Sequence, residues 1–129
     1  MVSQEGAHNG RFMLQYSKFC SCWRFMNAKS DVGEADTVVV DAPGGVTLNA
    51  WTHLAAVYDA TTRTVTIYVN GVPTSTTTTV APWQANGSFV VGRTRWTDGN
   101  SDWFPGDIDA VHAYQGVISA DMVQELSTN

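Results

Sequence analysis

The feature that most constrains the fold is a strand–turn–strand pattern in the middle of the chain. Residues 63–69 alternate valine and isoleucine with threonine and tyrosine, a period of two that is typical of a strand with one buried face. Asn70-Gly71 follows at once and leads into a second strand-like run over residues 72–79. Both central residues of a type I′ turn need positive φ, so Asn-Gly between two such runs is the strongest short hairpin signal. The pattern therefore predicts an antiparallel β-hairpin.

Similar strand patterns recur along the chain, punctuated by turn residues. They cover residues 11–16, 22–27, 37–41, 51–58, 88–91 and 104–114. The run over 51–58 is apolar on both faces, which predicts a central strand covered on both sides, with Trp51 in the core. About eight short strands with frequent turns favour an all-β sandwich or barrel.

The end of the chain has a helical pattern instead. Ser119 is a good N-cap, and Asp121 in the first turn complements the helix dipole. Met122, Val123 and Leu126 can form an apolar stripe. We therefore expect one short C-terminal helix.

Composition restricts the class of protein further. The chain of 129 residues has the length of one domain, and only 15% of its residues are charged, below the roughly 25% of typical soluble domains. A surface of threonine, serine and asparagine suits an extracellular module. The net charge of −5 argues against nucleic acid as a partner, because a sequence-independent grip on phosphates needs a positive face. No apolar run approaches the ~20 residues of a membrane span.

The two cysteines, Cys20 and Cys22, are separated by Ser21 alone. Along a regular strand they would point to the same face, too far apart for an unstrained bridge. The spacing favours two free thiols at a hairpin, whereas a Cys20–Cys22 disulfide requires a tight turn at Ser21. A metal site on this pair is disfavoured, because two thiols without further ligands nearby do not fill a tetrahedral shell.

Three blocks resemble one known family. The stretch WTHLAAVYDATTRTVTIYVNGVP from residue 51, FVVGRT over 89–94 and FPGDIDAVHAYQGVISADMVQEL over 104–126 are similar to the laminin-G-like domains of the concanavalin A-like lectin/glucanase kind. The resemblance implies an antiparallel β-sandwich jelly roll with a short C-terminal helix. It implies a single laminin-G-like domain over residues 1–129. It does not fix a function, since this fold carries lectins, glycosidases, adhesion modules and spacers.

The chain departs from the family pattern in two respects. Ala110 and His112 stand where the family usually has an acidic and a basic residue. Family members also carry strands before the point that corresponds to Met1, so the resemblance implies an N-terminally incomplete domain. In that case the sheet beside residues 104–114 has an open edge, which folded proteins rarely leave uncovered. A second copy, a complementing chain or a rearranged N-terminus would fill it, and a trimmed sandwich is the alternative.

Catalysis by this chain is not expected. Glycosidases of this fold resemble one another in a Glu-x-Asp-x-x-Glu strand, because retaining hydrolysis needs two carboxyl groups about 5 Å apart. The nearest match begins at Glu34 and Asp36 and has Val39 in place of the second glutamate. We therefore expect no enzyme activity.

Ca²⁺ is a candidate structural cofactor. Residues 97–102 form an acidic, glycine-containing loop with the oxygen ligands that Ca²⁺ favours. The candidate ligands are Asp98, Asp102, Asp107 and Asp109, and the resemblance implies a rim Ca²⁺ site. The alternative is that these aspartates form turns and accept backbone hydrogen bonds.

Carbohydrate is the leading candidate ligand. Sugar rings stack on exposed aromatic faces, and Trp96 and Trp103 flank the acidic loop with Arg93, Arg95 and Asn100 beside them. We therefore interpret the chain as a non-catalytic, secreted or extracellular recognition or adhesion module that binds carbohydrate or a protein surface. The alternative is a structural spacer or assembly domain that pairs with another chain through an open sheet edge. A binding module predicts an exposed Trp96 or Trp103, and a spacer predicts that both are packed.

Overall fold

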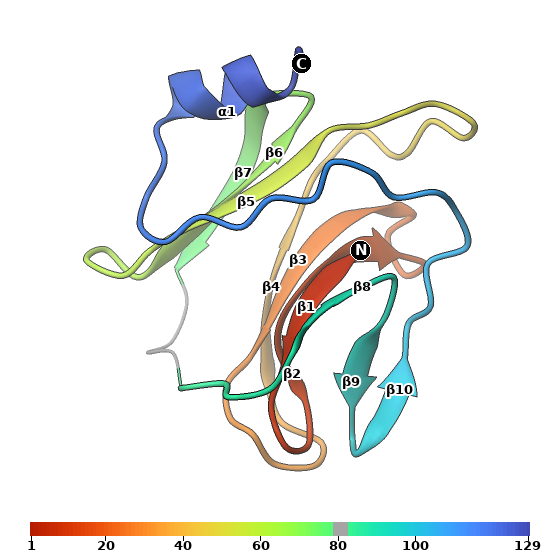
Figure 1. The fold of residues 1–129 in the computed structure, drawn as a ribbon, viewed down its shortest axis with the longest axis vertical. Coiled ribbons are helices and arrows are strands. Elements are labelled where there is room, and N and C mark those ends of the chain that lie inside the picture. Colours follow the sequence, from red (N-terminus) through yellow and green to blue (C-terminus); the bar gives the residue numbers. More distant parts are fainter. Residues whose placement is uncertain (79–82) are drawn as a thin grey trace.

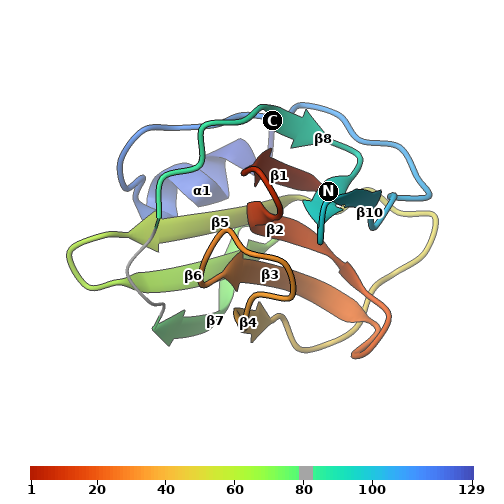
Figure 2. The same ribbon diagram turned by 90° about the horizontal axis from the view of Figure 1, so that it is seen from below.

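The computed structural model describes residues 1–78 and 83–129, which form strands and a short helix (Figures 1 and 2). In chain order the described elements are β1 (Val2–Glu5), β2 (Gly10–Ser17), β3 (Cys22–Ala28), β4 (Thr37–Asp41), β5 (Leu54–Asp59), β6 (Thr64–Val69), β7 (Val72–Thr78), β8 (Phe89–Val91), β9 (Thr94–Trp96), β10 (Gly99–Ser101) and α1 (Ala120–Leu126). The predicted fold class, an antiparallel β-sandwich with a short C-terminal helix, is confirmed. No helix in these two ranges is long and apolar enough to cross a membrane.

The described strands form two main sheets and one separate hairpin. The larger sheet has the order β4-β3-β2-β1-β8, the smaller has the order β5-β6-β7, and β9 pairs with β10. Every pairing among these strands is antiparallel. Figures 1 and 2 show the two main sheets as separate layers, with α1 near the end of the smaller sheet.

The core lies between the two layers, where their inner faces are in contact. Leu14, Trp23 and Phe25 from the larger sheet cluster with Val65 and Ile67 from the smaller one. The period-two alternation of β2, β3 and β6 places these side chains on the inner faces. The core is therefore built from the strands whose patterns are clearest in the sequence.

The predicted Asn-Gly hairpin is confirmed. β6 and β7 pair in antiparallel register, and the turn residues Asn70 and Gly71 have φ of 51° and 78°. The final residue of the predicted second strand, Thr79, lies outside the described residues. A Cβ on Gly71 would lie 2.4 Å from Oγ of Ser127, so glycine also allows the end of α1 to approach this turn closely.

The helix begins where the sequence predicts. Oγ of Ser119 accepts a hydrogen bond from the backbone N–H of Met122 at 3.2 Å, which is N-cap geometry. Val123 is fully buried, but Met122 is exposed, so the predicted apolar stripe is narrower than expected.

Cys20 and Cys22 form a disulfide, so the expectation of free thiols is wrong. Ser21 has a φ of 51°, and the two Cα atoms lie 5.1 Å apart. The tight turn that the bridge requires is therefore present between β2 and β3.

Two predicted strands differ from the structure. Residues 104–114 form no strand; they follow β10 as an extended trace that crosses the molecule toward α1 (Figure 1). Trp51 is 73% exposed and precedes β5, which is an edge strand of the smaller sheet. Both segments contain strand-like apolar residues, but among the described residues no strand pairs with residues 104–114 or with the outer edge of β5.

Candidate functional site

The predicted ligand-binding residues lie around the β9–β10 hairpin. Trp103, just after β10, is 67% exposed, and the guanidinium carbon of Arg93 lies 6.0 Å from its ring centroid. Nη1 of Arg93 donates to Oε1 of Glu5 in β1. That ion pair fixes the guanidinium beside the indole, within the distance at which cation–π attraction acts. One aromatic face and one oriented cation therefore lie together at the surface.

The hairpin separates the other predicted residues between two faces. Arg95 and Asn100 are directly paired across the strands, so their side chains share a face. Trp96 is adjacent to Arg95 and points to the opposite face, where it is half-buried. Nε of Arg95 donates to the carbonyl of Ala7 at 2.8 Å. The structure therefore brings Trp103 to Arg93, and Asn100 to Arg95, while Trp96 lies on the opposite face of the hairpin from Arg95 and Asn100.

The four candidate metal ligands are spread along the rim. Oδ1 of Asp98 lies 2.6 Å from Nδ1 of His8, and Oδ1 of Asp109 accepts the N–H of Ala110. In residues 1–78 and 83–129, one set of three potential metal ligands has its ligand atoms within 4.8 Å of one another: Cys20, Cys22 and Asp41. The sulfurs of Cys20 and Cys22 are already joined in the disulfide. Asp98, Asp102, Asp107 and Asp109 are therefore not assembled as a three-ligand set, and Ca²⁺ binding stays a prediction from the sequence.

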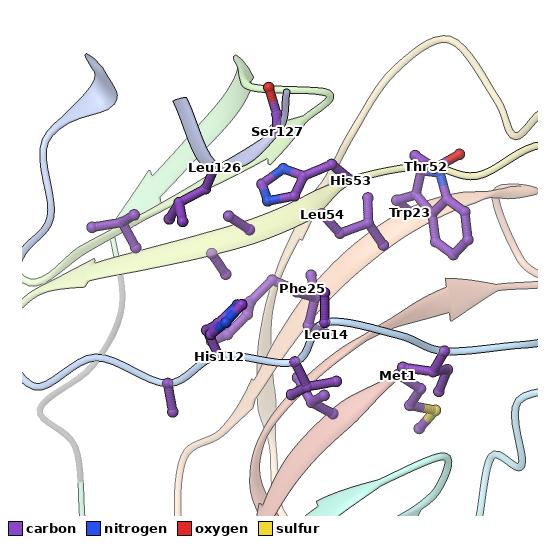
Figure 3. Close-up of a pocket in the computed structure, with 18 of the residues that line it drawn as sticks. Met1, Leu14, Trp23, Phe25, Thr52, His53, Leu54, His112, Leu126 and Ser127 are labelled. Atoms are coloured by element: carbon purple, nitrogen blue, oxygen red, sulfur yellow. The ribbon is translucent and has the colours of Figure 1, made fainter. Parts of the chain in front are cut away.

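A larger feature is a groove of about 830 Å³ between the two sheets. We call it the inter-sheet groove. Its walls are residues 50–58, which include most of β5, the segment 107–114, and inner side chains of β2 and β3 such as Leu14 and Phe25. Figure 3 shows His53 and Leu54 on the β5 side, with His112 across the opening.

The groove contains polar atoms that have no hydrogen-bond partner in the described part of the chain. Among the described residues, the buried side-chain atoms without a hydrogen bond are Nε of Arg11, Oε1 of Gln15, Oδ1 of Asn27, Nδ1 of His53 and the Tyr58 hydroxyl. All of these residues except Gln15 line the groove. Burial also lowers the pKa of His53 below its usual value. An unmet buried donor or acceptor costs about 1–3 kcal/mol, so this groove is suited to an occupant with polar groups.

The sequence patterns did not point to this groove. Its mouth includes Trp51 and residues 107–114. The apolar run over 51–58 predicts that Trp51 is in the core, and the strand-like pattern over 104–114 predicts that residues 107–114 are part of a paired strand. The available signal was that β5 is apolar on both faces. Such a strand needs other segments to cover both of its faces, and the sequence pattern does not show which segments these are.

Comparisons with known proteins agree with the fold. A family model described as the concanavalin A-like lectin/glucanases superfamily, Laminin_G_3, matches residues 1–124. A crystal structure of residues 221–444 of an S-layer domain-containing protein from Clostridium thermocellum superposes with a TM-score of 0.57 at 15% identity. That match covers 95% of this chain and 64% of that chain, so this chain spans less than two thirds of that structure. No curated protein matches.

Proposed function

Because this chain belongs to the concanavalin A-like lectin/glucanases superfamily, we propose that it is a non-catalytic extracellular recognition module that binds carbohydrate at Trp103 and Arg93. The observation that carries the proposal is the exposed indole of Trp103 beside a guanidinium held by Glu5. An exposed aromatic face stacks on the apolar face of a sugar ring, and an oriented guanidinium donates to hydroxyl oxygens.

Two further observations support this class of function. Few residues are charged, which suits a module outside the cell, and the similar crystal structure is of an S-layer domain-containing protein. A secreted or cell-surface location is part of the proposal. The Glu34–Val39 stretch lacks the second glutamate of the glycosidase pattern, which supports a non-catalytic role.

The test is glycan-array screening followed by calorimetry on the best glycan. We expect Trp103→Ala to weaken binding about fivefold, since an aromatic contact contributes on the order of 1 kcal/mol. Trp51→Ala is the matched control, because Trp51 is an equally exposed tryptophan at the groove mouth. Unchanged affinity in Trp103→Ala, or a larger loss in Trp51→Ala, contradicts the assignment.

Ca²⁺ enters the same experiment as a second variable. We propose that Asp98 and Asp102 hold a structural Ca²⁺ together with main-chain oxygens of their loop. A metal that binds the folded state raises Tm, so EDTA should lower the Tm of the native chain but not that of a D98N/D102N variant. An equal Tm of the native chain in Ca²⁺ and in EDTA refutes the metal site and leaves the carbohydrate site standing.

A further inference from the structure

The open edge of β5 forms one side of the inter-sheet groove. β5 pairs with β6 over Leu54–Asp59, and no other described strand is hydrogen-bonded to it. Along such an edge, alternate residues direct N–H and C=O groups away from the partner strand. All six residues of β5 are half-buried, so this edge is recessed in the molecule and is not a protruding rim. An incoming strand would therefore meet a preformed site.

A second set of unpaired backbone groups lies on the other side of the groove. From residue 105 to residue 118, no described backbone group bonds to the backbone of another segment. The N–H of Ala110 donates only to its neighbour Asp109, and a φ of 49° kinks the chain at Ala110. In Figures 1 and 2 this segment runs in the same direction as β5. A strand placed between them would be antiparallel to both, the favoured arrangement.

The size of the groove fits a short strand. The groove of about 830 Å³ is lined by residues 54–58, so it follows β5 over about five residues, the length of a typical strand. The unpartnered atoms of Asn27, His53 and Tyr58 on its walls match a polypeptide better than a hydrocarbon, because a peptide offers both donors and acceptors.

The charges at the groove mouth specify one end of the occupant. Asp107 and Asp109 are exposed, and neither forms an ion pair with a described residue. Asp107 also lines a second hollow together with Trp51, so its carboxylate lies near the residues that precede β5. The carboxyl end of a strand antiparallel to β5 would lie there. A basic residue at that end would therefore be complementary.

We propose that the inter-sheet groove binds an extended segment of another polypeptide. The segment adds as a strand between β5 and residues 111–114, antiparallel to both, with apolar side chains at alternate positions facing the core. Its carboxyl end carries a lysine or arginine beside Asp107 and Asp109. This strand addition is independent of carbohydrate binding at Trp103 and gives the domain a second, protein-directed site.

A peptide copied from β6 is the probe, because β6 already pairs with β5 in antiparallel register. The peptide carries residues 64–69 followed by two lysines. We expect saturable one-to-one binding by calorimetry and slower hydrogen exchange at β5 and at residues 111–114. The control peptide has the same side chains with alternate backbone nitrogens methylated, which removes ladder donors. It should bind at least about tenfold more weakly, since each lost bond is worth about 1 kcal/mol.

Two variants of the chain complete the test. The N–H of Ala113 has no hydrogen-bond partner among the described residues, so Ala113→Pro should leave Tm nearly unchanged yet weaken peptide binding severalfold. Ala113→Ser keeps the N–H and should bind like the native chain. Trp103→Ala should bind the peptide normally even if it loses glycan binding, so the two sites can fail separately.

Three results would overturn the inference. The first is no peptide binding up to millimolar concentration, and the second is equal binding by the methylated peptide. The third is that the chain self-associates in sedimentation experiments and that the peptide abolishes this self-association. That result would assign the groove to a second copy of this chain.

Discussion

The β2–β3 hairpin and residues 105–118 have the same kind of sequence and very different structures. Both contain a stretch in which apolar and polar residues alternate, as in a strand: residues 11–16 in the first and residues 107–110 in the second. β2 lies between β1 and β3, β3 lies between β2 and β4, and most of their side chains are buried or half-buried. Residues 105–118 have no paired strand in the described protein, and Val111, Tyr114 and Val117 are exposed.

The difference shows what an alternating pattern can and cannot specify. Alternation decides which side chains share a face, because that follows from local strand geometry. Whether the face is buried and the backbone bonded depends on a neighbouring strand, which is a property of the assembled sheet. The 105–118 segment carries the pattern of a strand without the neighbour.

Hydrogen exchange should give the largest contrast between the two regions. We expect the amides of β2 and β3 to exchange only on near-global opening, with free energies of about 5 kcal/mol or more. Amides of residues 105–118 should exchange close to the unfolded rate, because no described backbone acceptor protects them. The expected rate ratio is about 10³ or more. Protection of both regions to a similar degree would mean that a partner strand is present in solution.

Truncation of one apolar side chain in each region gives the next largest effect. Phe25 of β3 is 6% exposed and stacks on Phe12 at 6.0 Å. Phe25→Ala should lower the free energy of unfolding by about 3–5 kcal/mol. Val111 is 39% exposed, and Val111→Ala should change the free energy of unfolding by less than about 0.5 kcal/mol. Urea unfolding of both variants measures this. A loss above 2 kcal/mol for Val111→Ala would show that the 105–118 segment is packed.

The features that sequence predicted best are those with local causes. The positive φ at Asn70 and Gly71 follows from the residue types of the turn, and the Ser119 cap from one hydroxyl three residues before its donor. The Cys20–Cys22 bridge depends on the conformation of Ser21, which the residue type does not favour. The apolar run over residues 51–58 predicts that Trp51 is in the core, yet Trp51 is exposed. Whether its side chain is buried depends on a neighbouring segment and not on the run itself.

The candidate sites also combine features that follow from nearby residues with features that depend on the assembled sheets. Trp103 and Arg93 are both candidates from the sequence because they lie close to one loop, but their contact is known only from the structure. The face of Trp96 follows from its position next to Arg95, whereas the pairing of Arg95 with Asn100 required the β9–β10 register. In the turn of that hairpin Thr97 and Asp98, neither of them glycine, adopt positive φ. The inter-sheet groove joins residues some 50 positions apart in the sequence, so only the assembled sheets reveal it.

The smallest expected effect concerns charge in the two regions. Arg24 of β3 donates to Asp41 of β4 from Nε at 2.5 Å and from Nη2 at 2.8 Å. The hydrogen bond from Arg24 and its positive charge hold the pKa of Asp41 below the usual 3.8. Because the folded pKa is the lower one, the pair stabilises the fold fully above pH 3.8, and this stabilisation is lost as pH falls through the lowered pKa.

Asp41→Asn should therefore lower the free energy of unfolding at pH 7 by at most about 1 kcal/mol, since the carboxylate is partly exposed and screened. The difference from the native chain should shrink toward zero in acid. Asp107→Asn is the control, because Asp107 forms no ion pair with a described residue, and it should have no measurable effect at either pH. Urea unfolding at pH 7 and in acid separates the two cases. A loss for Asp107→Asn equal to that for Asp41→Asn would mean that a cation of another molecule already occupies the groove mouth.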